Sequence, residues 1–492
     1  MNARKVLMLE LNEINWGVID RLISQRGAAY LPNFDRLRNE GSWATQTAVE
    51  QSPHLDPWVT WVTLHTGVTR EVHGATVLEQ GSETILAKRL WDFVSAAGKS
   101  VGIFGSISAY PPRKVDGFMV PGPFAPGNET YPSQLQPVQG LNRLYTQVHN
   151  KLGKALSPIQ LLGMTLKLVK DFGLRPSTLL RVAFQLVREQ VEPHSRWRRV
   201  CLQPRLNYDF FSYLYRRYRP DFATWHTNHA AHFMHHYWRA WDDKGFTVPS
   251  SKDERERYGQ AVPTGYQLCD ELVGRFMKLI DSQTILVIAS SMGQQPYVSD
   301  RYRDGKIVVR FKNIDHFVDL VGREGLDDIV ATMVPQWNLR ITDGLRRAQV
   351  KARIESAYRV VDGQREPSIA VQETDGMLTV TPLGLSQNVD SIRYYFPNCP
   401  GALEQGYLIS EFFSLDAPTV KQGMHHPDGI LAFYGEGVRR GLAMDPCTNL
   451  DVAPTVLKMM GITIPAEMSG RALTEVWDES QLNHAELALQ VS

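Results

Sequence analysis

Cysteine is scarce in this 492-residue chain, and its four copies lie far apart, at positions 201, 269, 399 and 447. Such scattered thiols exclude a disulfide framework, and no two of them have the spacing of a zinc-binding pair. Long apolar runs are missing too, because none approaches the roughly 20 residues needed to cross a bilayer. An excess of one charge is also lacking, since the formal net charge is +1. These absences predict a globular protein with no transmembrane segment and no nucleic-acid partner.

The N-terminus lacks the features of a secretory signal. Residues 6–11 form an apolar run that is short and interrupted by Glu10, and no small-residue cleavage site follows it. We interpret this run as the first strand of the fold and expect a cytoplasmic protein.

Strand-like and helix-like segments alternate along most of the chain. With 43% hydrophobic residues, the chain is long enough for one large core and an inserted second domain. Short continuous apolar runs are typical of strands buried on both faces of a parallel sheet. Strands are predicted at 6–11, 100–104, 284–289 and 429–434, and helices at 16–37 (with a break at 31–33), 86–97 and 258–281. This order predicts an α/β fold with a doubly wound, mostly parallel sheet flanked by helices.

Residues 141–219 are helix-like and strongly basic, with 15 Lys and Arg against 4 Asp and Glu. Two interpretations stay open for this basic helical insertion. It is either a solvated appendage, or a basic lid that faces an anionic substrate or a membrane surface.

Residues 306–390 change to a pattern of alternating strands. Residues 349–358 and 377–381 are predicted as strands, and the Asp-Gly pair at 375–376 as a hairpin turn. We interpret this stretch as a small α+β insertion that caps the core. The core then comprises residues 1–140, 220–305 and 391–480, and a tail at 481–492 closes the chain.

Four stretches carry a family resemblance. They are Leu-Glu-Leu-Asn-Glu at 9–13; Thr-Gly at 66–67 with His-Gly at 73–74; Pro-Asp at 220–221 leading into Asn228 and His232; and His-His-Pro-Asp-Gly at 425–429 with Pro-Thr at 454–455 and Ser-Gly-Arg at 469–471. Together and in this order they resemble the alkaline-phosphatase superfamily. The likeness is greatest to its type I phosphodiesterase/nucleotide pyrophosphatase branch and its predicted phosphohydrolase/phosphomutase branch. The resemblance implies the same α/β fold.

The resemblance also implies a metal site, which this sequence alters. Hydrolases of the superfamily hold two divalent cations with three Asp and three His, because such cations need anionic oxygen ligands. His232 and His425 stand at two of the histidine positions. The other ligand positions differ: Asn12 replaces the strand-end Asp, Asn228 replaces the Asp of the Asp-x-x-x-His pair, and Ser291 with Met292 replaces an Asp-His pair. We therefore expect a divergent member that holds one divalent cation, zinc or manganese, or none. Its candidate ligands are His232, His425 and Glu13, the last as a displaced carboxylate.

The nucleophile position is altered as well. The superfamily places Ser or Thr at the start of a helix, where this chain has Asp56 followed by Pro57. This pair has the form of a helix N-cap with proline at the first helical position. Asp56 is then either a simple cap, or a ligand, general base or carboxylate nucleophile beside the helix N-terminus. Thr60 and Thr63 fall inside the helix and are poorer nucleophiles.

These residues define the predicted site and function. The catalytic candidates are Asp56, His232 and His425, and the substrate-binding candidates are Asn12, Asn228, Thr60, His426 and Ser291. The resemblance implies a hydrolase or transferase that acts on a phosphate, phosphodiester or sulfate ester of a small anionic intracellular metabolite. The alternative is a protein of the same fold that binds a ligand without turnover or transfers a group without metal. Helical spacing also places His229, His232 and His236 on one face, and a homo-oligomer stays compatible with the sequence.

Overall fold

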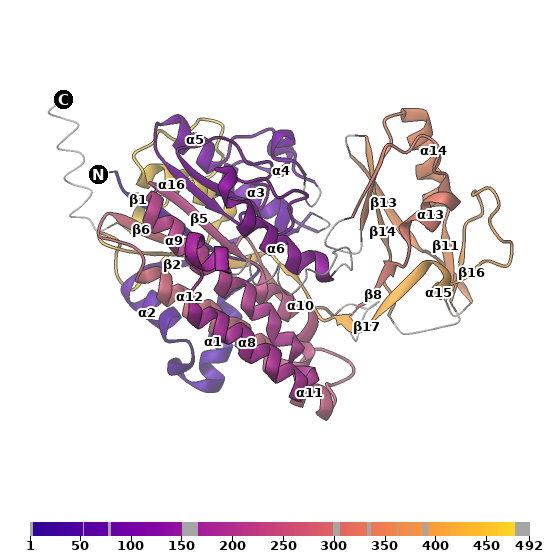
Figure 1. The fold of residues 1–492 in the computed structure, drawn as a ribbon, viewed down its shortest axis with the longest axis horizontal. Coiled ribbons are helices and arrows are strands. Elements are labelled where there is room, and N and C mark those ends of the chain that lie inside the picture. The colour runs from indigo at the N-terminus through magenta and orange to yellow at the C-terminus, as the bar shows by residue number, and fades with distance from the viewer. Residues whose placement is uncertain are drawn as a thin grey trace. The chain divides into compact units, whose positions relative to one another are not determined.

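The computed structural model describes residues 3–52, 54–76, 80–149, 166–298, 306–331, 336–361, 363–374, 376–386 and 392–477 (Figure 1). The chain divides into two compact units. Unit 1 comprises Met1–Asp242, Ser251–Gln295 and His425–Ser492, and unit 2 comprises Asp243–Ser250 and Pro296–Met424. The candidate site lies within unit 1.

Unit 1 is built on a nine-stranded sheet of order β20-β2-β19-β6-β1-β5-β3-β4, with β21 paired to β2. Its strands are β1 (Lys5–Leu11), β2 (Ser42–Thr47), β3 (Val101–Phe104), β4 (Gly117–Val120), β5 (Phe222–Thr227), β6 (Thr284–Ala289), β19 (Asp428–Tyr434), β20 (Leu442–Ala443) and β21 (Cys447–Thr448). Strand β19 runs antiparallel to both of its neighbours, whereas β1, β3, β4, β5 and β6 are parallel. The predicted mostly parallel α/β fold is confirmed.

Helices cover the sheet of unit 1, which Figure 1 shows between them. They are α1 (Trp16–Arg26), α2 (Pro32–Glu40), α3 (Pro57–Thr66), α4 (Arg70–His73), α5 (Leu90–Ala96), α6 (Gln136–His149), α8 (Pro176–Val191), α9 (Leu202–Tyr218), α10 (His229–Trp241), α11 (Lys252–Tyr258), α12 (Ala261–Met277) and α16 (Val452–Met459). Because both faces are covered, the side chains of β1 from Val6 to Leu11 are all buried, on one face as on the other. The predicted helix over 16–37 is present as α1 and α2, which separate at the expected break before Pro32.

The central strand β1 determines where the site lies. It pairs in parallel with β5 on one side and β6 on the other, with Leu11 opposite Thr227 and Glu10 opposite Ala289. The carboxyl ends of three neighbouring strands therefore meet at one edge of the sheet, which is where open α/β sheets bind ligands.

Unit 2 has its own core around Phe317, Leu339, Leu378 and Tyr394. Its strands are β8 (Lys306–Phe311), β9 (Asp328–Ala331), β10 (Trp337–Arg340), β11 (Tyr358–Val361), β12 (Gln364–Pro367), β13 (Ile369–Thr374), β14 (Met377–Pro382), β15 (Arg393–Tyr395), β16 (Tyr407–Leu408) and β17 (Phe413–Lys421), and its helices are α13 (Ile314–Val321), α14 (Gly344–Glu355) and α15 (Ile409–Phe412). The chain leaves unit 1 along β7 (Gly293–Pro296) and returns along β18 (Gly423–His426), and these two short strands pair with each other.

One strand predicted in unit 2 is wrong. Residues 349–358, expected to be extended, fall mostly in helix α14. Val350 and Ile354 are four residues apart and both buried, which is the spacing of a helix face, and Asp343 caps the helix by accepting from two of its first amides. The predicted hairpin is confirmed, since β13 and β14 are antiparallel with Thr374 opposite Met377. Its Asp375 lies outside the described residues.

The basic insertion predicted at 141–219 is helical where it is described, in α6, α8 and α9. Across the described part of the chain, no helix combines the length and the apolar character that a bilayer crossing demands.

Candidate active site

The turn that follows β1 carries the central residue of the site. Glu13 lies there with φ at +61°, in the left-handed region that residues other than glycine seldom adopt. Its side chain is buried, with only 2% of its surface exposed. Such backbone conformations are concentrated at functional sites, where the surrounding structure holds them in place.

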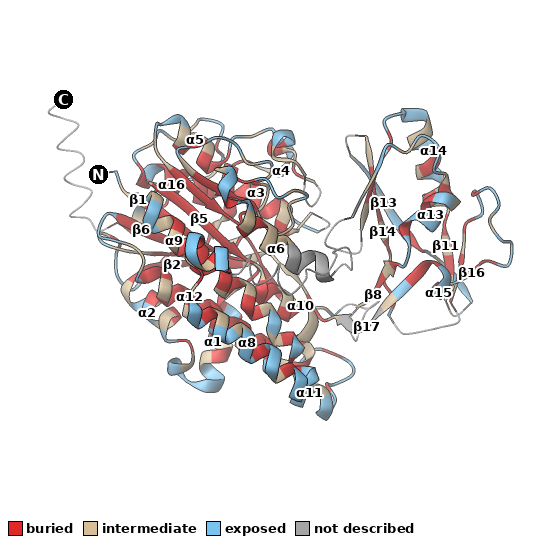
Figure 2. Ribbon diagram, viewed as in Figure 1, coloured by how far each residue is buried: buried red, intermediate tan, exposed pale blue. Residues whose placement is uncertain are grey.

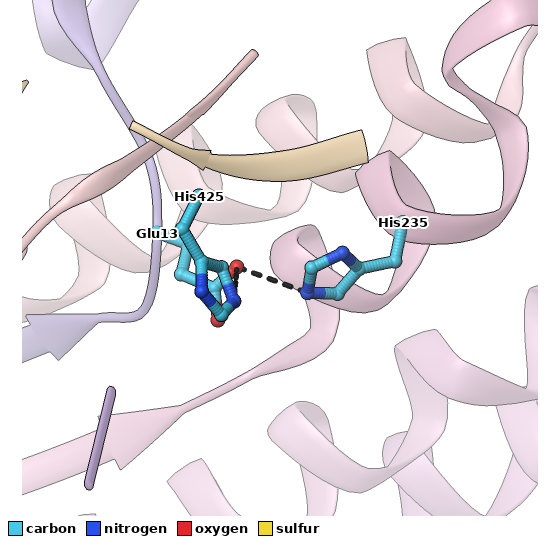
Figure 3. Close-up of side chains that lie close together, drawn as sticks. All are labelled: Glu13, His235 and His425. Atoms are coloured by element: carbon cyan, nitrogen blue, oxygen red, sulfur yellow. Dashed lines mark ion pairs between the residues drawn. The ribbon is translucent and has the colours of Figure 1, made fainter. Parts of the chain in front are cut away.

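Two histidines from distant parts of the chain converge on one oxygen of Glu13 (Figure 3). The His235 Nε2 atom lies 3.1 Å from Glu13 Oε2, and the His425 Nε2 atom lies 3.7 Å from the same oxygen. Gln294 also donates to Oε2, while Asn12 donates to Oε1 at 3.0 Å. The side chains of His235 and His425 keep 19% and 15% of their surface exposed, so solvent reaches this cluster.

The charge of Glu13 follows from these neighbours. Burial alone would raise the pKa of its carboxyl. The charges of His235 and His425, with hydrogen bonds from His235 and Gln294, outweigh burial and lower the pKa from 4.5 to about 2. Glu13 is therefore an anion at neutral pH.

The ring of His425 is oriented by the loop before α3. Its Nδ1 lies 2.7 Å from the backbone oxygen of Leu55 and 3.2 Å from Asp56 Oδ1. A carbonyl oxygen only accepts, so Nδ1 carries a proton and Nε2 is directed at Glu13. A hydrogen bond from Nδ1 to a carbonyl or carboxylate is the arrangement that orients metal-ligating imidazoles.

Asp56 occupies the predicted N-cap position of α3, before Pro57, but its side chain makes no capping hydrogen bond. About a quarter of that side chain (26%) is exposed. The carboxylate contacts His425 instead of the helix amides, so Asp56 does not act as a simple N-cap.

Asn12 serves Glu13. Its Oδ1 accepts from Trp61 Nε1 at 2.7 Å, and its Nδ2 donates to Glu13 Oε1 and, at 2.7 Å, to Asn228 Oδ1. The amide orientation follows from this network, because an indole nitrogen only donates. Asn12 therefore holds Glu13 in place, and Asn228 orients Asn12.

The ligand atoms of Glu13, His235 and His425 all lie within 4.8 Å of one another, and among the described residues they are the one group of three potential metal ligands at that separation. Tetrahedral metal–ligand distances of about 2.1 Å correspond to ligand atoms about 3.4 Å apart. The two distances from Glu13 Oε2, 3.1 and 3.7 Å, bracket that value. The donor set of one carboxylate and two imidazoles suits zinc or manganese, so the residues present fit one divalent cation.

A comparison with known families decides the membership of this chain. The sequence profile of the type I phosphodiesterase/nucleotide pyrophosphatase family matches residues 6–375, well over half of the protein. The chain belongs to this family.

Solved structures are similar at low sequence identity. They include mouse ectonucleotide pyrophosphatase/phosphodiesterase 5, with 11% identity and a TM-score of 0.41, over 96% of this chain and 100% of that one. An inactive variant of the mouse protein in complex with AMP gives 11% and 0.42 over the same shares, and the human protein gives 10% and 0.43 over 97% and 100%. No curated protein sequence matches this chain.

Within this phosphodiesterase-family chain, the structure brings Glu13, His425 and Asp56 together, and Asn12 and Asn228 beside them. Other predicted residues lie elsewhere. Thr60 and Ser291 are fully buried and bond to each other through their hydroxyls at 2.8 Å. His426 follows His425 in β18, and its Nδ1 accepts from the backbone of Asp428.

The histidines of the Asn228–His236 region divide by role. The His232 ring lies 4.5 Å from that of His236 rather than in the Glu13 cluster. His229 is buried between Thr227 and the backbone oxygen of Gly265, 2.9 and 3.1 Å from its two ring nitrogens. Burial lowers the pKa of His229 to about 4. It does not share a cluster with His232 as its spacing suggested.

Two residues of the cluster were not identified from the sequence, His235 and Gln294. His235 lies seven residues after Asn228, the N-cap of α10, and thus nearly on the same helix face. The family resemblance directed attention to the residue four after Asn228, which is His232. Gln294 follows the altered Ser-Met-Gly segment by one residue and enters the site from β7.

A second carboxylate–histidine cluster is more deeply buried and joins Glu10 of β1 to histidines of α3 and β5. Glu10 bonds to His65 Nε2 through Oε1 at 2.9 Å and to His226 Nδ1 through Oε2 at 3.2 Å. Burial would raise the pKa of Glu10, but the charges of and hydrogen bonds from the two histidines lower it to about 2. The Trp61 ring lies edge-on to His226, 5.2 Å away, and its indole nitrogen reaches Asn12.

Proposed function

We propose that this protein hydrolyses a phosphoester, with a phosphodiester as the first substrate class to test, at a one-cation site formed by Glu13, His235 and His425. The family membership supports the reaction class. The convergence of two imidazoles on one buried carboxylate oxygen supports the location of the cation site.

The orientation of His425 carries the proposal. Its Nδ1 proton is directed to Leu55 and Asp56, so its Nε2 meets an anionic oxygen of Glu13. An imidazole lone pair facing a carboxylate is repulsive unless a proton or a cation lies between them. Bound there, a divalent cation would stabilise the negative charge of a phosphoryl group and lower the pKa of a coordinated water.

The chain's own residues then have distinct roles. His235 and Glu13 would hold the cation with His425, and Asn12 and Gln294 fix the carboxylate that they contact. Asp56 keeps His425 in the required tautomer. Its partly exposed carboxylate is also the candidate general base for an attacking water. Attack by water is favoured over a protein nucleophile because Thr60 and Thr63 of α3 are fully buried.

Elemental mass spectrometry on protein purified without added metal or chelator tests the site. We expect about one zinc or manganese per chain, lost in Glu13→Gln and in His235→Ala. His232→Ala is the matched control, one helical turn away on α10, and should keep the ion. Retention of the cation in His235→Ala together with its loss in His232→Ala would refute this assignment.

Hydrolysis is tested with bis-p-nitrophenyl phosphate, p-nitrophenyl phosphate and p-nitrophenyl sulfate. We expect product from the diester to exceed that from the other two, and to fall in parallel with metal content across the variants. Equal turnover by wild type and Glu13→Gln would show that the chemistry lies elsewhere.

A second candidate function is ligand binding without turnover. The observation that favours it is the burial of the Thr60 and Thr63 hydroxyls of α3, the first bonded to Ser291 and the second to His73. In that case a phosphate ester would raise the melting temperature of the protein and be recovered intact. Product released by wild type but not by Glu13→Gln would exclude it.

A further inference from the structure

Helix α8, in the basic segment of unit 1, has its polarity reversed. The residues that it buries are Thr178, Gln185 and Glu189. Most of its large apolar residues face outward instead: Leu180 and Phe184 are each 71% exposed, Val187 is 65% exposed and Val191 is 79% exposed. A helix of a globular protein ordinarily buries such residues and exposes the polar ones. Within the described part of unit 1, nothing covers this apolar face, which makes it a candidate contact surface.

The four exposed residues form one continuous stripe. Their spacings of four, three and four residues are those of a single helix face. At 1.5 Å per residue, the stripe extends over about 17 Å. Figure 2 colours much of the α8 ribbon as exposed. The apolar stripe thus consists of Leu180, Phe184, Val187 and Val191.

The surface beside the stripe is basic. An open groove of about 900 Å³ adjoins α8 and is lined in part by Arg181, Arg188, Arg198 and Arg205. Arg188 pairs with Glu192 and Arg205 with Glu271, which leaves Arg181 and Arg198 without an ion pair among the described residues. Leu180, Phe184 and Val187 line the same groove. Apolar side chains next to several guanidinium groups match an acyl chain next to a phosphate.

We propose that the apolar stripe of α8 and the arginines beside it dock this protein on a membrane surface rich in anionic phospholipid. The stripe enters the boundary between headgroups and acyl chains, and the arginines contact lipid phosphates. The charge argues against a second copy of this chain as the occupant, because a two-fold interface would bring the same arginines of both copies face to face. The inference is independent of the phosphoester chemistry proposed above.

Vesicle flotation of the full-length protein tests the proposal, with phosphatidylcholine vesicles and with phosphatidylcholine mixed with phosphatidylglycerol. We expect binding to the mixed vesicles that weakens as salt is raised, and weaker binding to the neutral ones. Leu180→Gln and Phe184→Gln should each reduce the partition constant about tenfold, because each removes an inserted apolar side chain. Arg181→Gln should reduce it about fivefold.

Leu86→Gln is the matched control, since Leu86 is 79% exposed in the same unit but lies beside the end of α4, where its amide donates to the backbone oxygen of His73. It should bind as wild type does. Because all these positions are exposed, circular dichroism should confirm that each variant is folded. The proposal is overturned if wild type ignores both kinds of vesicle, if it binds both equally, or if Leu180→Gln with Phe184→Gln binds unchanged. A wild-type dimer that this double variant dissociates, without vesicle binding, would assign the stripe to a second copy instead.

Discussion

Two carboxylates three residues apart, Glu10 in β1 and Glu13 in the turn after it, each contact two histidines, yet the two clusters differ in geometry. Around Glu10 the histidines take different oxygens, so the carboxylate bridges them. Around Glu13 both imidazoles are directed at the same oxygen. Bridging pairs both oxygens of Glu10 within the fold, although His65 Nδ1 and His226 Nε2 stay buried without a hydrogen-bond partner among the described residues. Convergence on one oxygen instead leaves room for a cation at the common point.

Access to solvent separates the clusters further. Glu10 and His65 have no exposed surface and His226 has 3%, while the histidines around Glu13 keep 15–19%. Charge does not distinguish them, since the pKa of both carboxylates is lowered to about 2. One glutamate and two histidines therefore make structural contacts in one place and a candidate active site in the other. Geometry and access decide which.

Glu10→Gln should produce the largest change in stability. It leaves His65 and His226 buried without the carboxylate that both contact, and each buried group that loses its hydrogen-bond partner costs about 1–3 kcal/mol. Urea unfolding followed by tryptophan fluorescence should show a clearly lower midpoint, with metal content unchanged in the folded fraction. A midpoint equal to that of wild type would mean that the Glu10 cluster is not structural.

Glu13→Gln should act on function instead. We expect diesterase activity to fall at least about a hundredfold, which is the usual effect of removing an electrostatic group from an active site. The free energy of unfolding should change little, by about 1 kcal/mol or less, because water can reach the two histidines that lose their carboxylate partner. The comparison between the clusters breaks down if Glu13→Gln is as unstable as Glu10→Gln.

Asn12→Asp tests the connection between the turn and the cation. An aspartate keeps the acceptor for Trp61 but loses the N–H groups that reach Glu13 and Asn228, and it adds a like charge. With chelator present, we expect the free energy of unfolding to fall by about 1–3 kcal/mol. Added zinc or manganese should raise the melting temperature more than in wild type, because a further carboxylate lies near the ion.

Asn228→Asp is the matched control for that experiment, since it preserves the oxygen that accepts from Asn12. It should be less destabilising in chelator. An Asn12→Asp protein whose melting temperature is insensitive to both ions would contradict a cation site beside Glu13.

Much of the fold was predictable, because a strand that is buried on both faces has a continuous run of apolar residues. The apolar runs at 6–11 and 284–289 became β1 and β6, side by side at the centre of the sheet. The segment at 349–358 was not predictable in this way. Its polar and apolar residues fit a strand or a helix, and the capping of Asp343 with the paired burial of Val350 and Ile354 decided for the helix.

The site was predictable only in part. The strand ends identified the neighbourhood of Asn12, Glu13 and Asn228, since parallel strands end at one edge. Sequence could not choose between His232 and His235, because that choice depends on the rotation of α10 about its axis. Packing against α12 sets the rotation, through residues such as Phe233 and Met234.

His229, outside both clusters, gives the smallest effect and a test by pH. Burial lowers its pKa from 6.5 to about 4, so it stays neutral in the fold but takes up a proton on unfolding between those values. Unfolding therefore becomes easier as pH falls below 6.5, by at most about 1.4 kcal/mol per pH unit for one proton. His229→Gln should flatten the dependence of the urea midpoint on pH in that window, whereas His194→Gln, at an exposed position, should not. If the slope stays the same in His229→Gln, this imidazole is already protonated in the fold, and an isolated buried histidine would then need no carboxylate to carry its charge.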